Sequence, residues 1–219
     1  CEAVFHTCRP DPLLRLDRDR VASPRANQQV KRIVTVGRLV PSKGIDVLLR
    51  AMRKVKARNP AWSLELSVIG KGRLQGELTQ LARELGLADH VRFLGYLPQD
   101  EAYPHLAAAD VLALPFRSDP GPVVIPEGLG LGVPIIACAV DGIAELVKAG
   151  DAVRLVPPDD HDSLADALNE VLDNPALAER MSRDGRRLYE EKFRLEYWVQ
   201  NVQAWLEHSV CGASLGKNA

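Results

Sequence analysis

The chain has 219 residues, of which 46% are hydrophobic and 26% are charged, and its 28 basic and 29 acidic residues leave a formal net charge of -1. This composition is typical of a globular protein with one full domain, and it excludes the basic surplus of a nucleic-acid-binding domain. No apolar run approaches the roughly 18 residues of a membrane-spanning helix, and no stretch resembles a secretory leader. Because the chain opens with Cys1 and not with Met, we expect a segment or domain to precede it.

The cysteine pattern argues against a disulfide framework and against a zinc site. Cys1, Cys8, Cys138 and Cys211 form no C-x-x-C pair, and no histidine stands at metal-ligand spacing. Such a pattern favours reduced thiols. We therefore predict a cytoplasmic protein without a bound metal.

Short apolar runs alternate with amphipathic runs after a polar, arginine-rich lead. The apolar runs read as buried strands because they are hydrophobic on both faces. The predicted strands are 32–37, 64–70, 91–95, 110–115, 133–138 and 153–157. Strands of this kind, each followed by a helix, form a parallel sheet that is covered on two sides. We therefore predict an α/β fold, a three-layer Rossmann-like domain with about six strands.

The amphipathic runs have apolar residues at a spacing of three and four, which predicts helices. These are 45–58, 73–85, 99–108, 163–174, 175–193 and 195–208, and a further helix begins within 118–134. We predict a lead or linker at 1–30, the Rossmann-like domain at 31–192, a C-terminal helix at 193–208 and a tail at 209–219.

Ligands of an open parallel sheet bind beyond the carboxyl ends of the strands, where loops lead into helices. Four loops of this chain are predicted to lie there: GRLVPSKG (37–44), GKGR (70–73), GYLP (95–98) and FRSDPGPVVIPE (116–127). We expect the binding residues in these loops.

The first of these loops offers two cations beside a helix start. Gly37 ends the strand, Arg38 follows it, and Lys43 stands just before Gly44, where the next helix is predicted to begin. The free amides and the dipole of a helix N-terminus favour anions, as cations do. Arg38 and Lys43 are therefore candidate ligands of a diphosphate, with solvated loop cations as the alternative.

Glycines end the next two strands. Gly70 opens a run whose spacing departs from the dinucleotide fingerprint, and Tyr96 stands where that fingerprint places an acidic ribose ligand. We interpret Gly70 as a place where the backbone approaches a ligand closely, and Gly95 as the same for a planar base. An ordinary strand end is the alternative for Gly95.

The segment SDPGPVVIPEGLGLGVP (118–134) leaves a strand, turns and enters a helix. The first amides of a helix have no partner within it, and here they are expected at Val123, Val124 and Ile125. These three amides form a second candidate anion site.

The same segment carries two acids, Asp119 and Glu127, eight positions apart. A buried carboxylate at this edge accepts two hydrogen bonds from a ribose diol, whereas the alternative for Glu127 is that it complements the helix dipole. Three glycines follow Glu127, and each weakens a helix interior by about 1 kcal/mol relative to alanine. They either allow tight packing on a neighbour or mark an altered donor site.

These motifs resemble those of glycosyltransferase family 4, a group of retaining, nucleotide-sugar-dependent transferases with the B-type glycosyltransferase fold. The resemblance covers about 32–208 and corresponds to the C-terminal, donor-binding half of that fold. GRLVPSKG matches the family's G-R-L-x-x-x-K-G loop, and VRFLGYL matches its base-contacting segment. DGIAELV is similar to its G-G-x-x-E-[IL]-V turn. The two acids correspond to the family's pair of glutamates with seven residues between them.

The resemblance implies a role for each candidate residue. Arg38 and Lys43 would hold the donor diphosphate, Asp119 would contact the donor sugar, Glu127 would bind the ribose hydroxyls, and backbone near Leu94 to Leu97 would face the base. The implied reaction moves a sugar from a UDP-, GDP- or ADP-sugar to a hydroxyl of a sugar, lipid or other acceptor, with retained configuration. It implies no cofactor and no metal. It also implies an N-terminal acceptor-binding domain beyond this chain, through which peripheral membrane contact would occur.

The sequence departs from the family pattern at several positions, and two other functions stay open. Asp119 is one methylene shorter than the family's glutamate, and Asp141 replaces a glycine. One alternative is another enzyme class, either an epimerase of the same fold or a dehydrogenase-like nucleotide binder. The other is a non-catalytic nucleotide-sugar-binding domain or subunit that needs a separate acceptor-binding partner.

Overall fold

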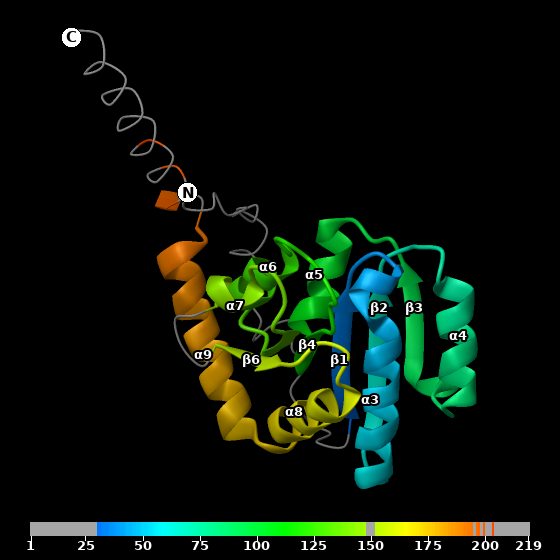
Figure 1. Ribbon diagram of the computed structural model, residues 1–219. Helices are drawn as coiled ribbons and strands as arrows, with labels where there is room; N and C mark the ends of the chain where they lie inside the picture. The colour runs from blue at the N-terminus through cyan, green and yellow to red at the C-terminus, as the bar shows by residue number, and fades with distance from the viewer. Residues whose placement is uncertain (1–29, 148–151, 195, 198, 200–202, 204–219) are drawn as a thin grey trace, which may run out of the picture.

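The computed structural model describes residues 30–147, 152–194, 196, 197, 199 and 203 (Figure 1). Within them, six strands form one sheet of order β3-β2-β1-β4-β5-β6, and every neighbouring pair is parallel. The strands are β1 (Val30–Val36), β2 (Ser63–Ile69), β3 (Val91–Gly95), β4 (Val111–Leu114), β5 (Ile135–Cys138) and β6 (Val153–Val156). The prediction of a parallel, Rossmann-like sheet of six strands is confirmed.

Helices follow the strands as the hydrophobic periodicity predicts, except for a short helix at 143–146 that was not predicted. They are α3 (Ile45–Arg58), α4 (Gln75–Glu84), α5 (Gln99–Ala107), α6 (Val124–Leu131), α7 (Ile143–Leu146), α8 (His161–Asp173) and α9 (Pro175–Lys192), with short 3-10 turns η1 (Pro41–Lys43) and η2 (Ala88–His90). Of the last predicted helix, 195–208, the described residues 196, 197, 199 and 203 are helical, and the others lie outside the described part. The predicted lead, apart from Val30, and the predicted tail also lie outside it.

Side-chain caps explain why α8 and α9 begin where they do. The Asp160 carboxylate accepts hydrogen bonds from the N–H groups of Asp162 and Ser163, both at 2.9 Å. The Asn174 side chain accepts one from the N–H of Leu177 at 3.0 Å. Each cap satisfies amides that have no partner inside the helix, so the junction between the two helices is set by local sequence.

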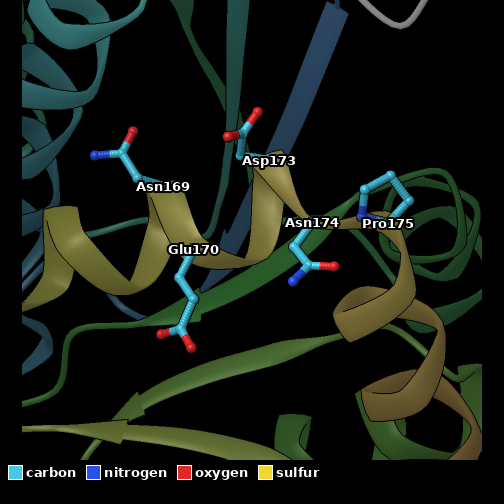
Figure 2. Close-up of a pocket in the computed structure, with 5 residues that line it drawn as sticks. All are labelled: Asn169, Glu170, Asp173, Asn174 and Pro175. Carbon is cyan, nitrogen blue, oxygen red and sulfur yellow. The ribbon is translucent and has the colours of Figure 1, made fainter.

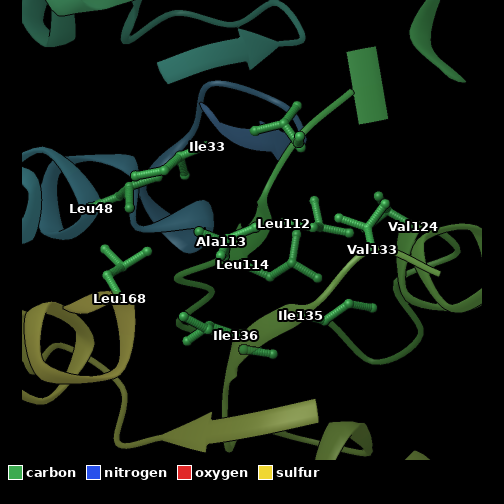
Figure 3. Packing of buried hydrophobic residues seen from close by; sticks show 14 of the residues in the cluster. Ile33, Leu48, Leu112, Ala113, Leu114, Val124, Val133, Ile135, Ile136 and Leu168 are labelled. Carbon is green, nitrogen blue, oxygen red and sulfur yellow. The ribbon is translucent and has the colours of Figure 1, made fainter. Parts of the chain in front are cut away.

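The helices cover the sheet on two sides (Figure 1). On one side, α3 packs against both α4 and α8, and on the other α5 packs against α6, which also contacts α9. Right-handed crossovers place the helices on opposite faces because the strand order runs outward in both directions from β1 and β4. Strands β4 and β5 are buried along their whole length, and Figure 3 shows the apolar side chains that fill this core, including Leu112 and Ile135.

The glycines after Glu127 let α6 lie close to its neighbours. A Cβ on Gly128 would stand 2.7 Å from Leu112 Cδ2 on β4 and 3.0 Å from Ile135 Cδ1 on β5. On α9, a Cβ on Gly185 would stand 3.1 Å from Leu129 Cδ2. Of the two explanations, tight packing is therefore the one that the contacts support for Gly128.

Candidate functional site

The strand order reverses between β1 and β4, so the loops after these two strands leave the sheet side by side. The N–H groups of Arg117 and Ser118 both donate to the carbonyl of Ser42, at 2.8 and 3.3 Å. Gly44 has a left-handed φ of 59°, and a Cβ there would stand 1.9 Å from the carbonyl oxygen of Pro115. The GRLVPSKG loop therefore fits against the start of the loop after β4 only with glycine at this position.

Lys43 lies where these two loops meet. Its ammonium forms an ion pair with the Asp119 carboxylate, and it stands over the ring of Phe116 at 4.2 Å from the centroid. The side chains of Lys43 and Asp119 are only 11% and 18% exposed. A Cβ on Gly37 would stand 3.4 Å from Lys43 Cδ, so the lysine stem passes over the end of β1. The structure thus brings together three residues that the sequence proposed: Gly37, Lys43 and Asp119.

Arg38 follows Gly37 and is exposed. Within the described part of the chain its side chain makes no hydrogen bond or ion pair. Beside it, Gly70 has a φ of 139°, and a Cβ there would stand 2.0 Å from the carbonyl oxygen of Gly37. The close approach expected at Gly70 is therefore made to the neighbouring loop of the protein itself, which holds the ends of β1 and β2 together.

The end of β3 presents backbone at the same edge. The carbonyl of Gly95 accepts a hydrogen bond from the N–H of Gly70 at 2.7 Å, and Gly95 has a left-handed φ of 72°. The side chains of Leu94 and Leu97 are half-buried and pack on the core, whereas Tyr96 is 69% exposed. The two leucines can therefore meet a ligand mainly through their backbone.

The start of α6 offers two of the three expected amides. The N–H of Ile125 donates to the carbonyl of Pro122 at 3.1 Å, so it is already paired. The N–H groups of Val123 and Val124 have no acceptor among the described residues. Pro126 is the third residue of α6, where its missing N–H breaks no helical hydrogen bond.

Glu127 is buried, with 8% of its surface exposed. Its Oε1 accepts hydrogen bonds from Gln99 Nε2 at 2.7 Å and from the Tyr103 hydroxyl at 3.1 Å, while Oε2 accepts none from the described residues. Burial raises the pKa of the Glu127 carboxyl, and the hydrogen bonds from Gln99 and Tyr103 oppose this less strongly. A buried carboxylate with one oxygen left over suits a ligand that donates hydrogen bonds.

Sequence reasoning missed the residues that support these groups. Gln99 and Tyr103 stand one helical turn apart on α5, a spacing that places them on the same side of that helix. Arg117 lies in the same loop as Asp119 and contacts Asp46 on α3, and Asp141 contacts this loop from the loop after β5. The i, i+4 pair on α5 was a visible signal, but no local pattern in the sequence pointed to the other two.

An open hollow of the described surface lies away from these residues. An open depression of about 500 Å³ is lined by Asn169, Glu170, Asp173, Asn174 and Pro175, at the corner between α8 and α9 (Figure 2). Lys31 Nζ donates to the carbonyl of Leu172 at 2.8 Å, which places this corner beside the amino end of β1. The depression is therefore at the edge of the sheet opposite to Lys43, Asp119 and Glu127.

The described residues contain no group of three histidine, cysteine, aspartate or glutamate side chains arranged to hold a metal ion. Among the same residues, no helix combines the length and the apolar character needed to cross a membrane.

Comparison with known proteins identifies the family. Residues 18–188 match the model of the family described as glycosyl transferases group 1. The chain is 35% identical, over 162 residues, to a GDP-mannose-dependent alpha-(1-6)-phosphatidylinositol monomannoside mannosyltransferase of Mycolicibacterium smegmatis; this match covers 70% of the chain and 42% of the relative.

Solved structures give the same result for the fold. Sucrose-phosphate synthase of Thermosynechococcus elongatus superposes with a TM-score of 0.74 at 27% identity, covering 95% of this chain and 50% of that one. The C-terminal domain of a glycosyl transferase group 1 protein (LpcC) of Francisella tularensis superposes with a TM-score of 0.68 at 21% identity, covering 82% of this chain and 99% of that domain. The chain spans less than half the length of the curated relative. From these matches and its six-stranded parallel sheet, the chain belongs to the glycosyl transferases group 1 family.

Proposed function

We propose that this chain is the donor-binding half of a retaining glycosyltransferase of family 4, which moves a sugar from a nucleotide diphosphate sugar to an acceptor hydroxyl. One observation carries the proposal: Lys43, Asp119 and Glu127 come from separate positions in the chain and converge at the carboxyl edge where β1 and β4 diverge. This is the place where an open α/β sheet binds its ligand.

The cations of the edge suit the leaving group of such a reaction. When the anomeric bond breaks, negative charge develops on the departing diphosphate, and preorganised donors lower the barrier most when they face that charge. Lys43 is held in place by Asp119 and Phe116, and Arg38 is free to approach from solvent. The N–H groups of Val123 and Val124 would add hydrogen bonds from the start of α6.

Glu127 is proposed to bind the ribose hydroxyls through the carboxylate oxygen that no described residue occupies. The base is proposed to lie against the backbone of Leu94 and Leu97, whose side chains pack into the core. Asp119 is proposed to contact the donor sugar. A relative whose name specifies GDP-mannose makes GDP-mannose the first donor to test, beside UDP- and ADP-sugars.

The acceptor site is proposed to lie in a second domain outside this chain, since relatives of the family are more than twice as long as the part matched here. A sugar or lipid hydroxyl is the expected acceptor, and any peripheral membrane contact would run through that domain. The cytoplasmic location and the independence from a metal or cofactor are also part of the proposal. Cys138, which is buried and unpaired, fits a reducing compartment.

The proposal is tested by thermal unfolding of the 219-residue chain with UDP, GDP, ADP and GDP-mannose. At least one nucleotide should raise the Tm, because a ligand that binds only the folded state stabilises it. Glu127→Ala should abolish the shift, whereas Glu170→Ala, an exposed acid near the opposite edge, should retain it. If no nucleotide shifts the wild-type chain, the donor site is wrongly assigned. Binding without sugar transfer by a longer chain would favour the non-catalytic alternative.

A further inference from the structure

Arg117 ties together three loops at the carboxyl edge. Its Nη1 and Nη2 donate to the two oxygens of Asp46 at 2.9 and 2.8 Å, in the paired geometry that suits a guanidinium and a carboxylate. Nη1 also donates to the carbonyl of Pro41 at 2.7 Å, and Nε donates to the Asp159 carboxylate. One side chain therefore joins the loop after β4 to η1, to the start of α3 and to the loop after β6.

These contacts leave Arg117 unsuited to bind a phosphate itself. A guanidinium has five N–H donors, and four of them are occupied within the chain. Burial alone would raise the pKa of Asp46, but hydrogen bonds and nearby positive charge, chiefly from Arg117, outweigh it, so the pKa of Asp46 is lowered. The charge of Arg117 is therefore already engaged by protein carboxylates.

Two aspartates with left-handed backbone hold the same loop. Among the described residues other than glycine, only Asp141 and Asp159 have a positive φ, at 45° and 58°. The Asp141 carboxylate accepts the N–H of Asp119 at 2.7 Å, and the Asp159 carboxylate accepts Nε of Arg117. A left-handed conformation disfavours a residue with a side chain by about 1–2 kcal/mol, and aspartate tolerates it because its carboxylate can form local hydrogen bonds. Both left-handed residues thus place their carboxylates against residues 117–119.

We propose that Arg117 is a positioning residue, which holds the loop of Asp119 against η1 so that Lys43 and Asp119 form a preformed pair before the donor binds. The backbone supports the same arrangement, since the N–H groups of Arg117 and Ser118 both donate to the carbonyl of Ser42. Preorganisation of this kind strengthens binding because the ligand does not have to order the loops. This inference rests on the proposed donor site and adds a residue to it that contacts no part of the donor.

The inference predicts that Arg117 affects the diphosphate part of the ligand and not the nucleoside part. Arg117→Met removes the guanidinium and its paired hydrogen bonds while keeping a long side chain. It should weaken the binding of the diphosphate that binds the wild type (UDP, GDP or ADP) by about tenfold. Binding of the matching nucleoside, measured by calorimetry on the 219-residue chain, should change by less than about twofold. The diphosphate affinity of Arg117→Lys should lie between those of the wild type and Arg117→Met, because lysine keeps the charge but not the paired hydrogen bonds.

Two further variants make the test specific. Arg154→Met removes an exposed ion pair with Glu170, remote from the site, and should leave the binding of both ligands unchanged. Asp159→Gly removes one arm of the Arg117 contacts but accommodates the φ of 58° without strain, so the fold should persist even if Arg117→Met unfolds. It should weaken diphosphate binding by about threefold, again with nucleoside binding unchanged.

Equal losses for diphosphate and nucleoside in Arg117→Met would overturn the inference, because a merely structural residue acts on the whole site. Unchanged diphosphate binding in Arg117→Met would overturn it as well. If Arg117→Met does not fold, unchanged diphosphate binding in Asp159→Gly would overturn the inference instead. In both cases the donor site itself would stand. If the wild-type chain binds no nucleoside diphosphate, the proposed function fails, and this inference fails with it.

Discussion

The ammonium of Lys43 lies against the carboxylate of Asp119, although 76 positions separate them in the chain. In the proposed donor site these residues have different partners, the diphosphate for the lysine and the sugar for the aspartate. Without a ligand each of them satisfies the other, in a place where both side chains are largely withdrawn from water. The pair therefore keeps two charges in position that would otherwise be costly to bury.

Asp119→Asn should tighten the binding of a nucleoside diphosphate that lacks the sugar by about threefold to tenfold, because Lys43 is no longer neutralised and a negative charge near the phosphates is removed. The amide still offers an oxygen to the N–H of Gly121, which the Asp119 Oδ1 accepts at 3.3 Å. Calorimetric titration measures the change. Asp166→Asn, which removes an exposed ion pair with Arg58, is the matched control and should have no effect. Weaker binding by Asp119→Asn would show that Lys43 does not face the phosphates.

Lys43→Ala and Arg38→Ala should each weaken the binding of a nucleoside diphosphate more than that of its nucleoside. The loss should be larger for Lys43, about tenfold or more, because its charge is largely shielded from solvent, whereas that of exposed Arg38 is screened by water and salt. Affinities for both ligands, measured side by side, give the two ratios. Lys54→Ala, which lacks only an exposed pair with Asp162, should leave both unchanged. Losses of equal size for the two ligands would mean that these cations do not touch phosphate.

Glu127→Gln should make the ligand-free protein more stable at pH 7, because it removes a buried charge while keeping the side chain's shape. The pKa of Glu127 in the folded protein is raised above its ordinary value of 4.5, so the protonated carboxyl favours the folded state. That contribution is complete below pH 4.5 and is lost as the pH rises through the folded-state pKa.

The difference in Tm between Glu127→Gln and the wild type should therefore be small near pH 4 and should grow toward pH 7. Thermal unfolding at several pH values measures it. The same variant should bind nucleoside about tenfold less tightly, since an amide accepts hydrogen bonds from a ribose diol less well than a carboxylate. A stability difference that shrinks with rising pH would contradict the direction assigned to Glu127.

Gly128→Ala should lower the free energy of unfolding by about 1–2 kcal/mol, because the new methyl group would collide with fully buried Leu112 and Ile135, and this overpacking outweighs the gain in helix propensity. Gly76→Ala in α4 is the matched control. A Cβ there would meet nothing within 4 Å, so the substitution should stabilise the protein by up to about 1 kcal/mol. Denaturant unfolding of the two variants gives the comparison. A stabilising Gly128→Ala would show that α6 has room to move away from the sheet.

Local patterns were sufficient for the six strands and for the longer helices, but not for α7. The six apolar runs are the six strands, within a few residues at each end. The four loops at the carboxyl edge follow from the order of these strands along the chain. Gly37, Lys43 and Asp119 were predicted as ligands of one site, and the structure places them together. The amide of Ile125 was also expected to be free, and the structure pairs it with Pro122, because a tight turn precedes α6.

The support of the site could not be predicted in the same way. Arg117 reaches Asp46 across 71 positions of sequence, and Gln99 reaches Glu127 across 28. Neither contact follows from periodicity or from turn chemistry, because each depends on how whole helices and loops dock on the sheet. The left-handed backbone of Asp141 and Asp159 is likewise set by the contacts that their carboxylates make with the loop after β4.

By itself, the sequence determined the alternation of strands and helices, the glycines that let loops approach one another, and the chemical types gathered at the ends of the strands. These follow from short-range rules of backbone conformation and hydrophobic periodicity. Only the tertiary structure decided that β1 and β4 are neighbours, and hence that Lys43 and Asp119 form a pair that Arg117 holds in place. The physical reason is that strand order is fixed by burial of both sheet faces and by right-handed crossovers, which act between segments far apart in the chain.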